Sequence, residues 1–593
     1  VADVDYDIVK IEETRKILAG RRNVRKMLDE DLKASSDSLG KILAASDALQ
    51  AGGDQITANH HLSNVLFNVM RGGIFADNYS VDTKDFADFA KRNDAGIRKA
   101  FEKFFKFLPE KMDVGELREK VAGLGSPDME RICMEYLPLT FSRRHGDPSR
   151  PWNHFAIRVK NPDGSRILDY QGNWRDIFQN WEALCISYPE FIESTIAKFL
   201  NATNAEGYNP YRVTRNGFEW EVPEPHLSWA NIGYWGDHQV IYLLRLLELS
   251  EKFHPDTLHA LLGRRIFSYS DIPYELKSYK EILANPRDTI VFNFDRNSAI
   301  EKTVKQRGTS GKLVNVDGKV FHASMMEKFL AVVLSKLSNF VPGGGIWLNT
   351  QRPEWNDANN ALAGYGLSMV TVYYLHRFLK FMDGISARHL EEEFQVSAEM
   401  AGLFRRITEV LENNRKIAAR SSIPDSDRRK MMDELGTAAC EFRKALYRKG
   451  ISGRTVSISG AEIAGFLKVA QEWTSQSIAL NERKDGLFHS YNVLVMKPGG
   501  AAGVKYLYEM LEGQVAVLSS GFLSPARSLK LTESLRKSSM YREDQNSYLL
   551  YPDRPVQTFF QKNRIPEKVA VKSRLLKKLL ADGDTQIVSR DCR

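Results

Sequence analysis

The chain has 593 residues, with 83 Lys and Arg against 75 Asp and Glu, which gives a net charge of +8. This length allows one large domain or several smaller ones, and it is ample for a sizeable buried core. Hydrophobic residues at 43% and charged residues at 27% exclude wholesale disorder. No run approaches the ~18 apolar residues of a membrane span. Acidic residues are interleaved with the basic ones, so we expect a mixed solvated surface and no nucleic-acid partner.

The four cysteines indicate the compartment. They lie far apart, at Cys133, Cys185, Cys440 and Cys592, which excludes a zinc knuckle and a disulfide scaffold. Isolated thiols suit a reducing compartment, so we expect a cytoplasmic protein. The first residue is Val1 and no signal peptide follows it. We expect a piece of a longer polypeptide, with a processed or cut chain as the alternative.

The apolar spacing predicts a mainly α protein with three parts. Residues 1–139 form a helical N-terminal region, and the glycines at 72 and 73 end one of its helices. Residues 140–520 read mostly as pairs of helices, and residues 521–593 form a C-terminal segment that we expect to be truncated. The predicted helices of the middle part span 174–187, 189–200, 238–253, 255–262, 321–337, 364–382, 391–412, 425–447 and 461–475. Small β-insertions interrupt it, at 155–170 and near 288–322, and the charged pair at 391–447 forms an arm.

The helix at 364–382 indicates how these pairs are arranged. Its apolar residues point to all sides, and a helix that is apolar all round is buried all round. In a helical protein of this size, that pattern suggests an inner layer of helices wrapped by an outer layer. A toroid of helix hairpins, the (α/α)6 barrel, has such an inner ring, and loops at one end of it line a pocket.

The segment 343–360, which enters this helix, carries the densest chemistry. Arg352, Glu354, Trp355, Asn356 and Asp357 follow one another closely. A Trp offers a flat apolar face to a sugar ring, while Arg, Asn and Asp side chains bond hydroxyls. A carboxylate whose pKa the pocket raises could protonate a glycosidic oxygen. The alternative is that Asp357 only caps the helix that follows.

Two further helix starts repeat the combination of Trp with Asp. Trp174, Arg175 and Asp176 open one helix, and Trp235 with Asp237 opens the next. One such start is a cap, whereas three suggest loops that converge on one end of a barrel. The alternative at the first start is a salt bridge favoured by the helix dipole. The Asp at the second start precedes a His but has no third ligand at helical spacing, so we expect no metal and no other cofactor.

Other candidates are isolated. The loop 204–215 could bring Glu206, Tyr208 or Arg212 to the pocket rim, or it could be a surface turn. Late in the chain, Glu512 is the candidate base for an inverting hydrolase, which needs a second carboxylate to activate water. His489 is the candidate contact for phosphate, since a phosphorylase needs no such base; its alternative is a structural role.

The segment 352–357 (Arg-Pro-Glu-Trp-Asn-Asp) resembles the Asp-Trp-Asn-Asp segment of cellobiose and chitobiose phosphorylases and related (α/α)6 glycosidases. The match has Glu354 in place of the first Asp. The chain also resembles large bacterial proteins of this superfamily. The resemblance implies an (α/α)6 barrel, with Asp357 as the general acid. It further implies that Arg175 and Asp176 hold the sugar at the cleavage site.

These patterns leave three functions open. The first is a glycoside hydrolase that cleaves an oligosaccharide with inversion, with Asp357 as the acid. The second is a phosphorylase that cleaves the same bond with inorganic phosphate. The third is a noncatalytic glycan-binding or scaffold module of a larger protein, which the charged arm at 391–447 favours.

Overall fold

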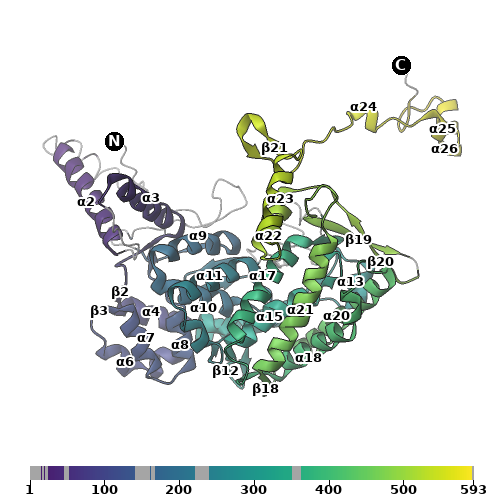
Figure 1. Cartoon of the computed structure of the whole chain (residues 1–593). Coiled ribbons are helices and arrows are strands. Elements are labelled where there is room, and N and C mark those ends of the chain that lie inside the picture. The colour runs from purple at the N-terminus through teal and green to yellow at the C-terminus, as the bar shows by residue number, and fades with distance from the viewer. Residues whose placement is uncertain are drawn as a thin grey trace.

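The computed structural model describes Arg15, Ala19 and residues 24–45, 53–140, 161, 167–220, 239–349, 362, 364–497 and 499–589. The chain is mainly α, as predicted, with short antiparallel strands between the helices (Figure 1). One continuous apolar core extends from Val65 to Met540, so the N-terminal helices share it with the rest of the molecule.

The N-terminal part begins with two long helices and continues as a small folded unit. Helix α2 spans Val24–Ala45, and α3 spans Gln55–Gly72 and packs against the later helix α9 (Trp174–Ser187). Helix α3 ends at the predicted glycines, since Gly73 takes a φ of 108° that other residues rarely adopt. The unit that follows contains α4 (Thr83–Asn93), α5 (Ala95–Ala100), α6 (Glu102–Phe107), α7 (Val114–Ala122) and α8 (Pro127–Met134).

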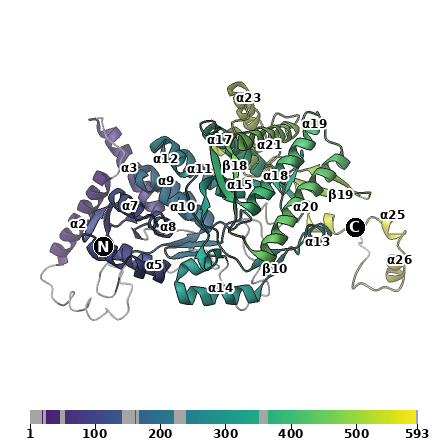
Figure 2. The same ribbon diagram turned by 90° about the horizontal axis from the view of Figure 1, so that it is seen from below.

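The two ends of this unit lie side by side. Strand β1 (Ile74–Phe75) pairs antiparallel with β4 (Leu139–Thr140), and inside the unit β2 (Ser80–Asp82) pairs with β3 (Lys111–Asp113). A chain segment that leaves and returns at one place has the geometry of an insertion. Figure 2 shows the unit beside the main body.

The main body consists of helices that pack in pairs. They are α9, α10 (Ile192–Ala202), α11 (Gln239–Phe253), α12 (Thr257–Leu261), α13 (Tyr279–Ala284), α14 (Phe294–Arg307), α15 (Met325–Leu337), α17 (Met369–Ser386), α18 (Ala398–Asn413), α20 (Asp425–Lys449), α21 (Gly460–Leu480) and α22 (Leu511–Ser519). Helices α10 and α15 are buried along their whole lengths, and α17 is buried along most of its length. The expectation that α17 lies inside is therefore confirmed.

Two sheets lie at the ends of these helices. The larger has the order β14 (Phe340–Val341), β15 (Gly345–Trp347), β16 (Gly366–Ser368), β19 (Tyr491–Lys497) and β20 (Ala501–Tyr506). The smaller joins β5 (Gln171–Asn173), β6 (Arg212–Thr214) and β7 (Gly217–Glu219). Strand β5 leads directly into α9, and β16 leads directly into α17, so each sheet fixes the start of one helix.

Two segments differ from the sequence expectation. Residues 294–307 of the expected β-insertion form α14, because Asn293 caps a helix there by accepting a hydrogen bond from the Arg296 N–H. The expected turn at 316–319 is present between β11 (Asn315–Val316) and β12 (Lys319–Val320). The charged pair at 391–447 is not an arm: α18 and α20 bury apolar faces against each other and the core. Its first residues form strand β17 (Glu393–Ser397) instead of helix, paired with β18 (Thr455–Ser459).

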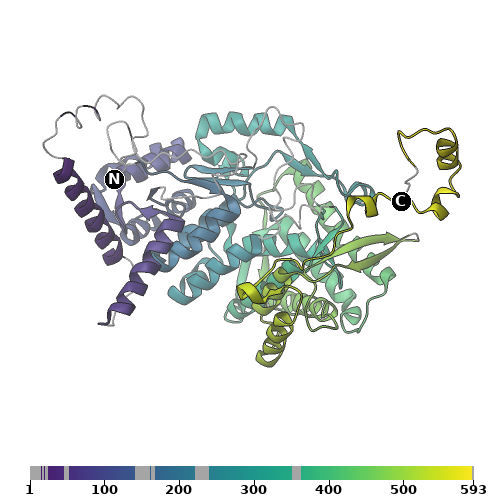
Figure 3. The ribbon, with the colours of Figure 1, turned by 90° about the horizontal axis from the view of Figure 1, so that it is seen from above.

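The last described part extends away from the body (Figures 1 and 3). After α23 (Pro525–Arg536), the short helices α24 (Phe559–Lys562), α25 (Glu567–Ala570) and α26 (Arg574–Ala581) have no buried residue. Among the residues that the structure describes, every helix is too short or too polar to cross a lipid bilayer. The first strand of the expected hairpin at 155–170 lies outside the described residues; residues 167–170, where the second strand was expected, are described and form no strand.

Candidate functional site

The helices α9 and α11 run in the same direction. They pack against each other. The carboxylate of Glu193, at the start of α10, accepts a hydrogen bond from the Ser250 hydroxyl at 2.5 Å and lies 3.0 Å from His254 Nδ1, both at the end of α11. Helix α10 is therefore antiparallel to α11. Because α10 also folds back on α9 after the short 3-10 turn Pro189–Phe191, α9 is parallel to α11.

Helix α17 runs in this direction too. It packs against α11, and Arg377 of α17 pairs with Glu248 of α11 at 2.7 Å. His389, just after the end of α17, lies 2.7 Å from His259 of α12, which follows the end of α11. The N-terminal ends of α9, α11 and α17 therefore lie at one end of the body (Figure 1). The segment 174–176 lies at the start of α9, the segment 235–237 comes just before α11 in the sequence, and the segment 352–357 precedes α17 with strand β16 between them.

Seven of the predicted site residues belong to segments outside the described residues. They are Trp235, Asp237, Arg352, Glu354, Trp355, Asn356 and Asp357. The described residues that flank residues 350–361 in the sequence are joined to one another by hydrogen bonds. Trp347 Nε1 donates to the Gly364 carbonyl at 3.0 Å, and Gly364 N donates to the Leu348 carbonyl at 2.7 Å. Asn349 Nδ2 donates to Asn339 Oδ1 at 2.7 Å.

At the start of α9, three predicted residues are described. Trp174 is buried and packs on Phe178 and Phe199, with ring centroids 4.5 and 4.8 Å away. Its backbone N–H donates to the Tyr211 carbonyl at 2.9 Å, which joins α9 to the loop 204–211. Arg175 and Asp176 are half-buried. They are the two of the three that a ligand could reach, whereas Trp174 acts as a packing residue here.

His489 and Glu512 lie together beside the start of α17. Met369 N donates to the Ser490 carbonyl at 2.9 Å, and Gly513 N donates to Ser490 Oγ at 2.8 Å. The Tyr491 hydroxyl donates to Glu512 at 2.9 Å. The separation of His489 and Glu512 along the sequence does not predict that they lie near each other. Their proximity arises from the fold of the chain around strand β19.

The protonation of His489 bears on its predicted contact with phosphate. Its Nδ1 lies 3.0 Å from the Leu507 carbonyl, which can only accept a hydrogen bond, and its ring stacks on Tyr506 at 4.6 Å. Burial, with the positive charge of Arg483, lowers the pKa of His489 to about 4. The imidazole is therefore neutral near pH 7, and it offers phosphate a polar contact without a positive charge.

The loop 204–211 is buried, so the alternative of a surface turn is wrong. Tyr208 is 4% exposed, and its hydroxyl accepts from Asn339 Nδ2 at 3.4 Å, beside the base of the segment at 350–361. Glu206 is 8% exposed and accepts a hydrogen bond from the Tyr447 hydroxyl at 2.9 Å. Arg212 pairs with Glu219 across β6 and β7. A carboxyl buried so deeply is a feature of functional sites.

The burial of Glu206 predicts a pH-dependent stability. Desolvation raises its pKa from 4.5 to about 7, so between these values the folded chain holds a proton that the unfolded chain releases. The stabilisation is complete below pH 4.5 and is lost as the pH rises through 7, by up to about 3 kcal/mol. Relative to wild type, Glu206→Gln should therefore gain thermal stability between pH 5 and pH 8. The measurement is the melting temperature of both proteins at several pH values in this range. A difference in melting temperature that stays constant from pH 5 to pH 8 would contradict the prediction.

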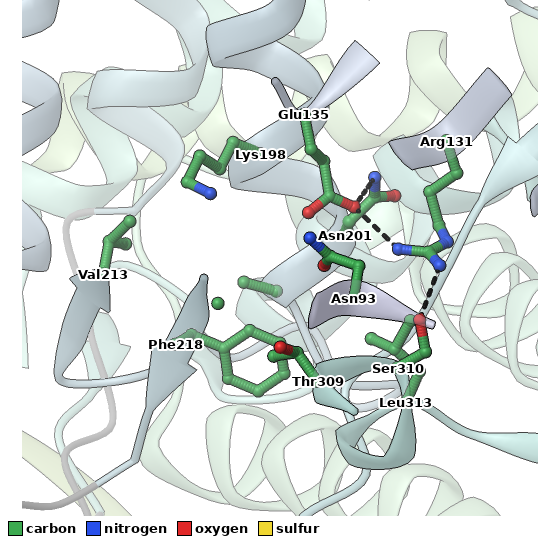
Figure 4. A pocket seen from close by; sticks show the side chains of 12 residues that line it. Asn93, Arg131, Glu135, Lys198, Asn201, Val213, Phe218, Thr309, Ser310 and Leu313 are labelled. Atoms are coloured by element: carbon green, nitrogen blue, oxygen red, sulfur yellow. Dashed lines mark hydrogen bonds and ion pairs between the residues drawn. The ribbon is translucent and has the colours of Figure 1, made fainter. Parts of the chain in front are cut away.

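A small cavity lies between the unit 74–140 and the main body. Its volume is about 20 Å³. Figure 4 shows Glu135, the residue after α8, between Arg131 and Asn201, which donate to the same carboxylate oxygen at 3.2 and 2.8 Å, with Lys198 of α10 across the space. Burial lowers the pKa of Lys198 to about 8. This group is not among the residues predicted from the sequence, although a lone Lys within the apolar helix 192–202 is a usable signal.

The three cysteines that the structure describes, Cys133, Cys185 and Cys440, are buried thiols. Burial raises the pKa of the first two to about 12. Such thiols are inert near neutral pH. Among the described residues, no group of three or more His, Cys, Asp and Glu side chains is placed to hold a metal ion.

Two parts of the sequence match described families. Residues 75–138 match insertion domain 1 of glycoside hydrolase family 149, and residues 556–593 match insertion domain 2 of the GH149 phosphorylases. No curated protein matches the sequence. The first match coincides with the unit that β1 and β4 close. The resemblance to glycoside phosphorylases of the six-hairpin superfamily is thereby confirmed, and the matches indicate a carbohydrate-active phosphorylase enzyme.

Proposed function

We propose that the chain is an inverting glycoside phosphorylase, which cleaves an oligosaccharide with inorganic phosphate. The observation that carries this proposal is the match of residues 556–593 to an insertion domain of phosphorylases, joined by the match of residues 75–138. For this reason we propose phosphorolysis, and not the hydrolysis that the sequence placed first, as the reaction. A phosphorylase needs no base to activate water, so Glu512 has no assigned part in the chemistry.

In the proposed reaction, a phosphate oxygen forms a bond to the anomeric carbon while the glycosidic C–O bond breaks. Asp357 gives its proton to the leaving oxygen and is reprotonated from solvent, while the phosphate, which attacks from the opposite face, releases one proton to solvent, so protons balance. The products are a sugar 1-phosphate and a shortened saccharide. Arg175 and Asp176 hold the hydroxyls of the sugar, with Arg352, Glu354, Trp355, Asn356, Trp235 and Asp237 around it. His489 contacts phosphate.

We propose further that the helices form an (α/α)6 toroid within residues 140–520. The parallel directions of α9, α11 and α17, with α10 opposed to them, support the proposal because helix hairpins in a ring alternate in this way. The domain boundaries at residues 139 and 520 likewise remain predictions. The alternative of a noncatalytic module was favoured by the charged arm expected at 391–447. Because α18 and α20 pack on the core, that support is removed.

The base of the segment that carries Asp357 offers a test of positioning. Trp347→Phe keeps an aromatic ring in the core but removes the hydrogen bond to the Gly364 carbonyl, a loss of about 1 kcal/mol. We expect kcat to fall about tenfold, because small displacements of a catalytic group are costly. The matched control is Trp473→Phe, which removes a similar bond to the Leu411 carbonyl elsewhere. Equal kcat values in the two variants would contradict the prediction.

The proposed function is tested by product release from a panel of α- and β-linked gluco-oligosaccharides, with and without inorganic phosphate. We expect a sugar phosphate to form only when phosphate is present. Release of free sugar at the same rate without phosphate would instead establish hydrolysis. Absence of any cleavage across the panel would count against both enzymes.

A further inference from the structure

Asn339 lies where three parts of the fold meet. It comes between α15 and strand β14 in the chain. Its backbone carbonyl accepts a hydrogen bond from Trp347 N of β15 at 2.8 Å. Its side chain contacts Asn349, which follows β15, and Tyr208, in the loop 204–211. One residue at the end of α15 therefore joins strand β15 to this loop.

The side-chain amide of Asn339 has a single orientation in this network. Its Nδ2 donates to the Ser335 carbonyl, one helical turn earlier, at 3.0 Å and to the Tyr208 hydroxyl at 3.4 Å. A carbonyl oxygen can only accept, so the nitrogen must face Ser335. The oxygen Oδ1 then faces Asn349 and accepts from its Nδ2 at 2.7 Å. Aspartate has no donor for the first side and leucine has neither group, so the position requires an amide.

The loop that carries Tyr208 is held against α15. Tyr208 N donates to Asn204 Oδ1 at 2.8 Å, and the Tyr208 carbonyl accepts from Asn204 N at 2.9 Å. Gly207 takes a φ of 81°, and a β-carbon there would collide with the Ala331 carbonyl oxygen of α15. Lys336 Nζ of α15 lies 5.6 Å from the centroid of the Tyr208 ring, within the range of a cation–π contact. The position of Tyr208 therefore determines the position of the whole loop.

The far end of the same loop holds the start of α9. The Tyr211 carbonyl accepts from Trp174 N at 2.9 Å. Strand β6, which follows the loop, pairs with β5, which leads directly into α9. Arg175 and Asp176, the two predicted site residues that a ligand could reach, come next in the chain. Asn339 is therefore connected to them through one loop and two hydrogen bonds.

We propose that Asn339 is a positioning residue, which sets the placement of the segment that carries Asp357 relative to the start of α9. It acts through Asn349 on one side and through Tyr208 on the other. The reaction that this placement serves rests on the proposed function, whereas the structural link itself does not. An acid and the groups that hold the sugar must meet the same sugar ring, so their mutual placement affects the rate strongly.

The link is tested without turnover by hydrogen exchange of the full chain, measured by mass spectrometry. Asn339→Ala removes the side-chain hydrogen bonds to both neighbours. We expect the amides of residues 204–211 and 345–349 to exchange about tenfold faster, because both segments lose a contact that limits their local opening. The rest of the chain should exchange as in wild type.

Asn414→Ala is the matched control. Asn414 follows α18 as Asn339 follows α15, and its Nδ2 donates to the Val410 carbonyl at 2.9 Å and to Glu434 at 2.8 Å. The variant therefore removes bonds of the same kind at the end of another helix. It should leave exchange in both test segments, and kcat, unchanged.

The positioning role is tested by kinetics with an oligosaccharide and inorganic phosphate. Asn339→Ala should lower kcat about tenfold and change KM by less than about twofold, because it displaces reacting groups. A purely structural role would lower the melting temperature and leave kcat of the folded enzyme at the wild-type value. Tyr208→Phe and Asn349→Ala each remove one side of the link and should each lower kcat by a smaller factor. They keep the test valid if Asn339→Ala fails to fold.

Wild-type exchange in both segments of Asn339→Ala would overturn the inference. Faster exchange in only one segment, faster exchange throughout the chain, or a wild-type kcat would overturn it too. The two proposals can fail separately. Faster exchange in both segments without phosphorolysis by wild type would leave the link standing and remove the proposed function, and phosphorolysis that Asn339→Ala leaves unchanged would do the reverse.

Discussion

Asp357→Asn should abolish phosphorolysis while leaving the chain folded. The amide cannot donate an acidic proton to the leaving oxygen, so the glycosidic bond would have to break with an alkoxide leaving group. Positioned general acids contribute about 10²–10⁴-fold to rate. We therefore expect kcat to fall by at least about a hundredfold, with little change in KM.

Two controls make this result specific. Asp383→Asn changes an exposed carboxylate on α17 and should leave kcat unchanged. Glu354→Gln changes the other carboxylate of the same segment and should affect KM more than kcat, because a residue that grips the sugar contributes to binding. A hundredfold loss in Glu354→Gln with full activity in Asp357→Asn would reverse the assignment of the acid.

Arg131→Met should strongly destabilise the contact between the unit 74–140 and the main body. Arg131 is 2% exposed and donates to Glu135 at 3.2 Å and to the Ser310 hydroxyl at 2.8 Å. Methionine fills much of the space but leaves the Glu135 carboxylate without its counter-charge. Breaking one partner of a buried ion pair costs about 3–5 kcal/mol, which should appear in the free energy of unfolding measured with urea.

The double variant Arg131→Met/Glu135→Gln provides the control. Without the carboxylate, no uncompensated charge remains, and we expect the double variant to recover part of the stability that the single variant loses. A loss below about 1 kcal/mol in Arg131→Met would mean that solvent reaches this pair. It would also mean that other contacts hold the unit, among them the ion pairs Arg215–Asp85 and Arg307–Asp94.

Much of the helical framework follows from the sequence. The prediction of a helix at 174–187 is correct at both ends, because its apolar residues recur at helical spacing and Pro189 follows it. The helix predicted at 238–253 is placed within one residue for the same reason. The capping box of Ser459 and Glu462, in which each side chain bonds the other's backbone, fixes the start of α21 one residue before the prediction.

The errors have local causes. The three glutamates at 391–393 favour helix, but Phe394 and Val396 alternate inward at the spacing of a strand. Helix α14 has no buried residue, so no apolar stripe marks it. Helices α10 and α15 are buried on every face although each contains a few polar residues. The spacing of apolar residues cannot distinguish such a helix from an amphipathic helix with one exposed face.

The candidate site is predictable only in part. Recurrence of Trp and Asp predicts three segments, of which only that at 174–176 lies among the described residues, and the starts of the described helices α9, α11 and α17 lie at one end of the body. The environment of Glu206 is not predictable, because it depends on residues that are far apart along the chain, such as Arg443 and Tyr447. Their proximity arises from tertiary packing, which no local pattern encodes.

The most direct test of the central claim is a ³¹P NMR time course of the full chain with an oligosaccharide and inorganic phosphate. Our account predicts that the inorganic phosphate signal declines while a sugar 1-phosphate signal of inverted anomeric configuration grows, and that both changes stop in Asp357→Asn. A constant phosphate signal during cleavage of the oligosaccharide would contradict it, since the bond would then be broken by water.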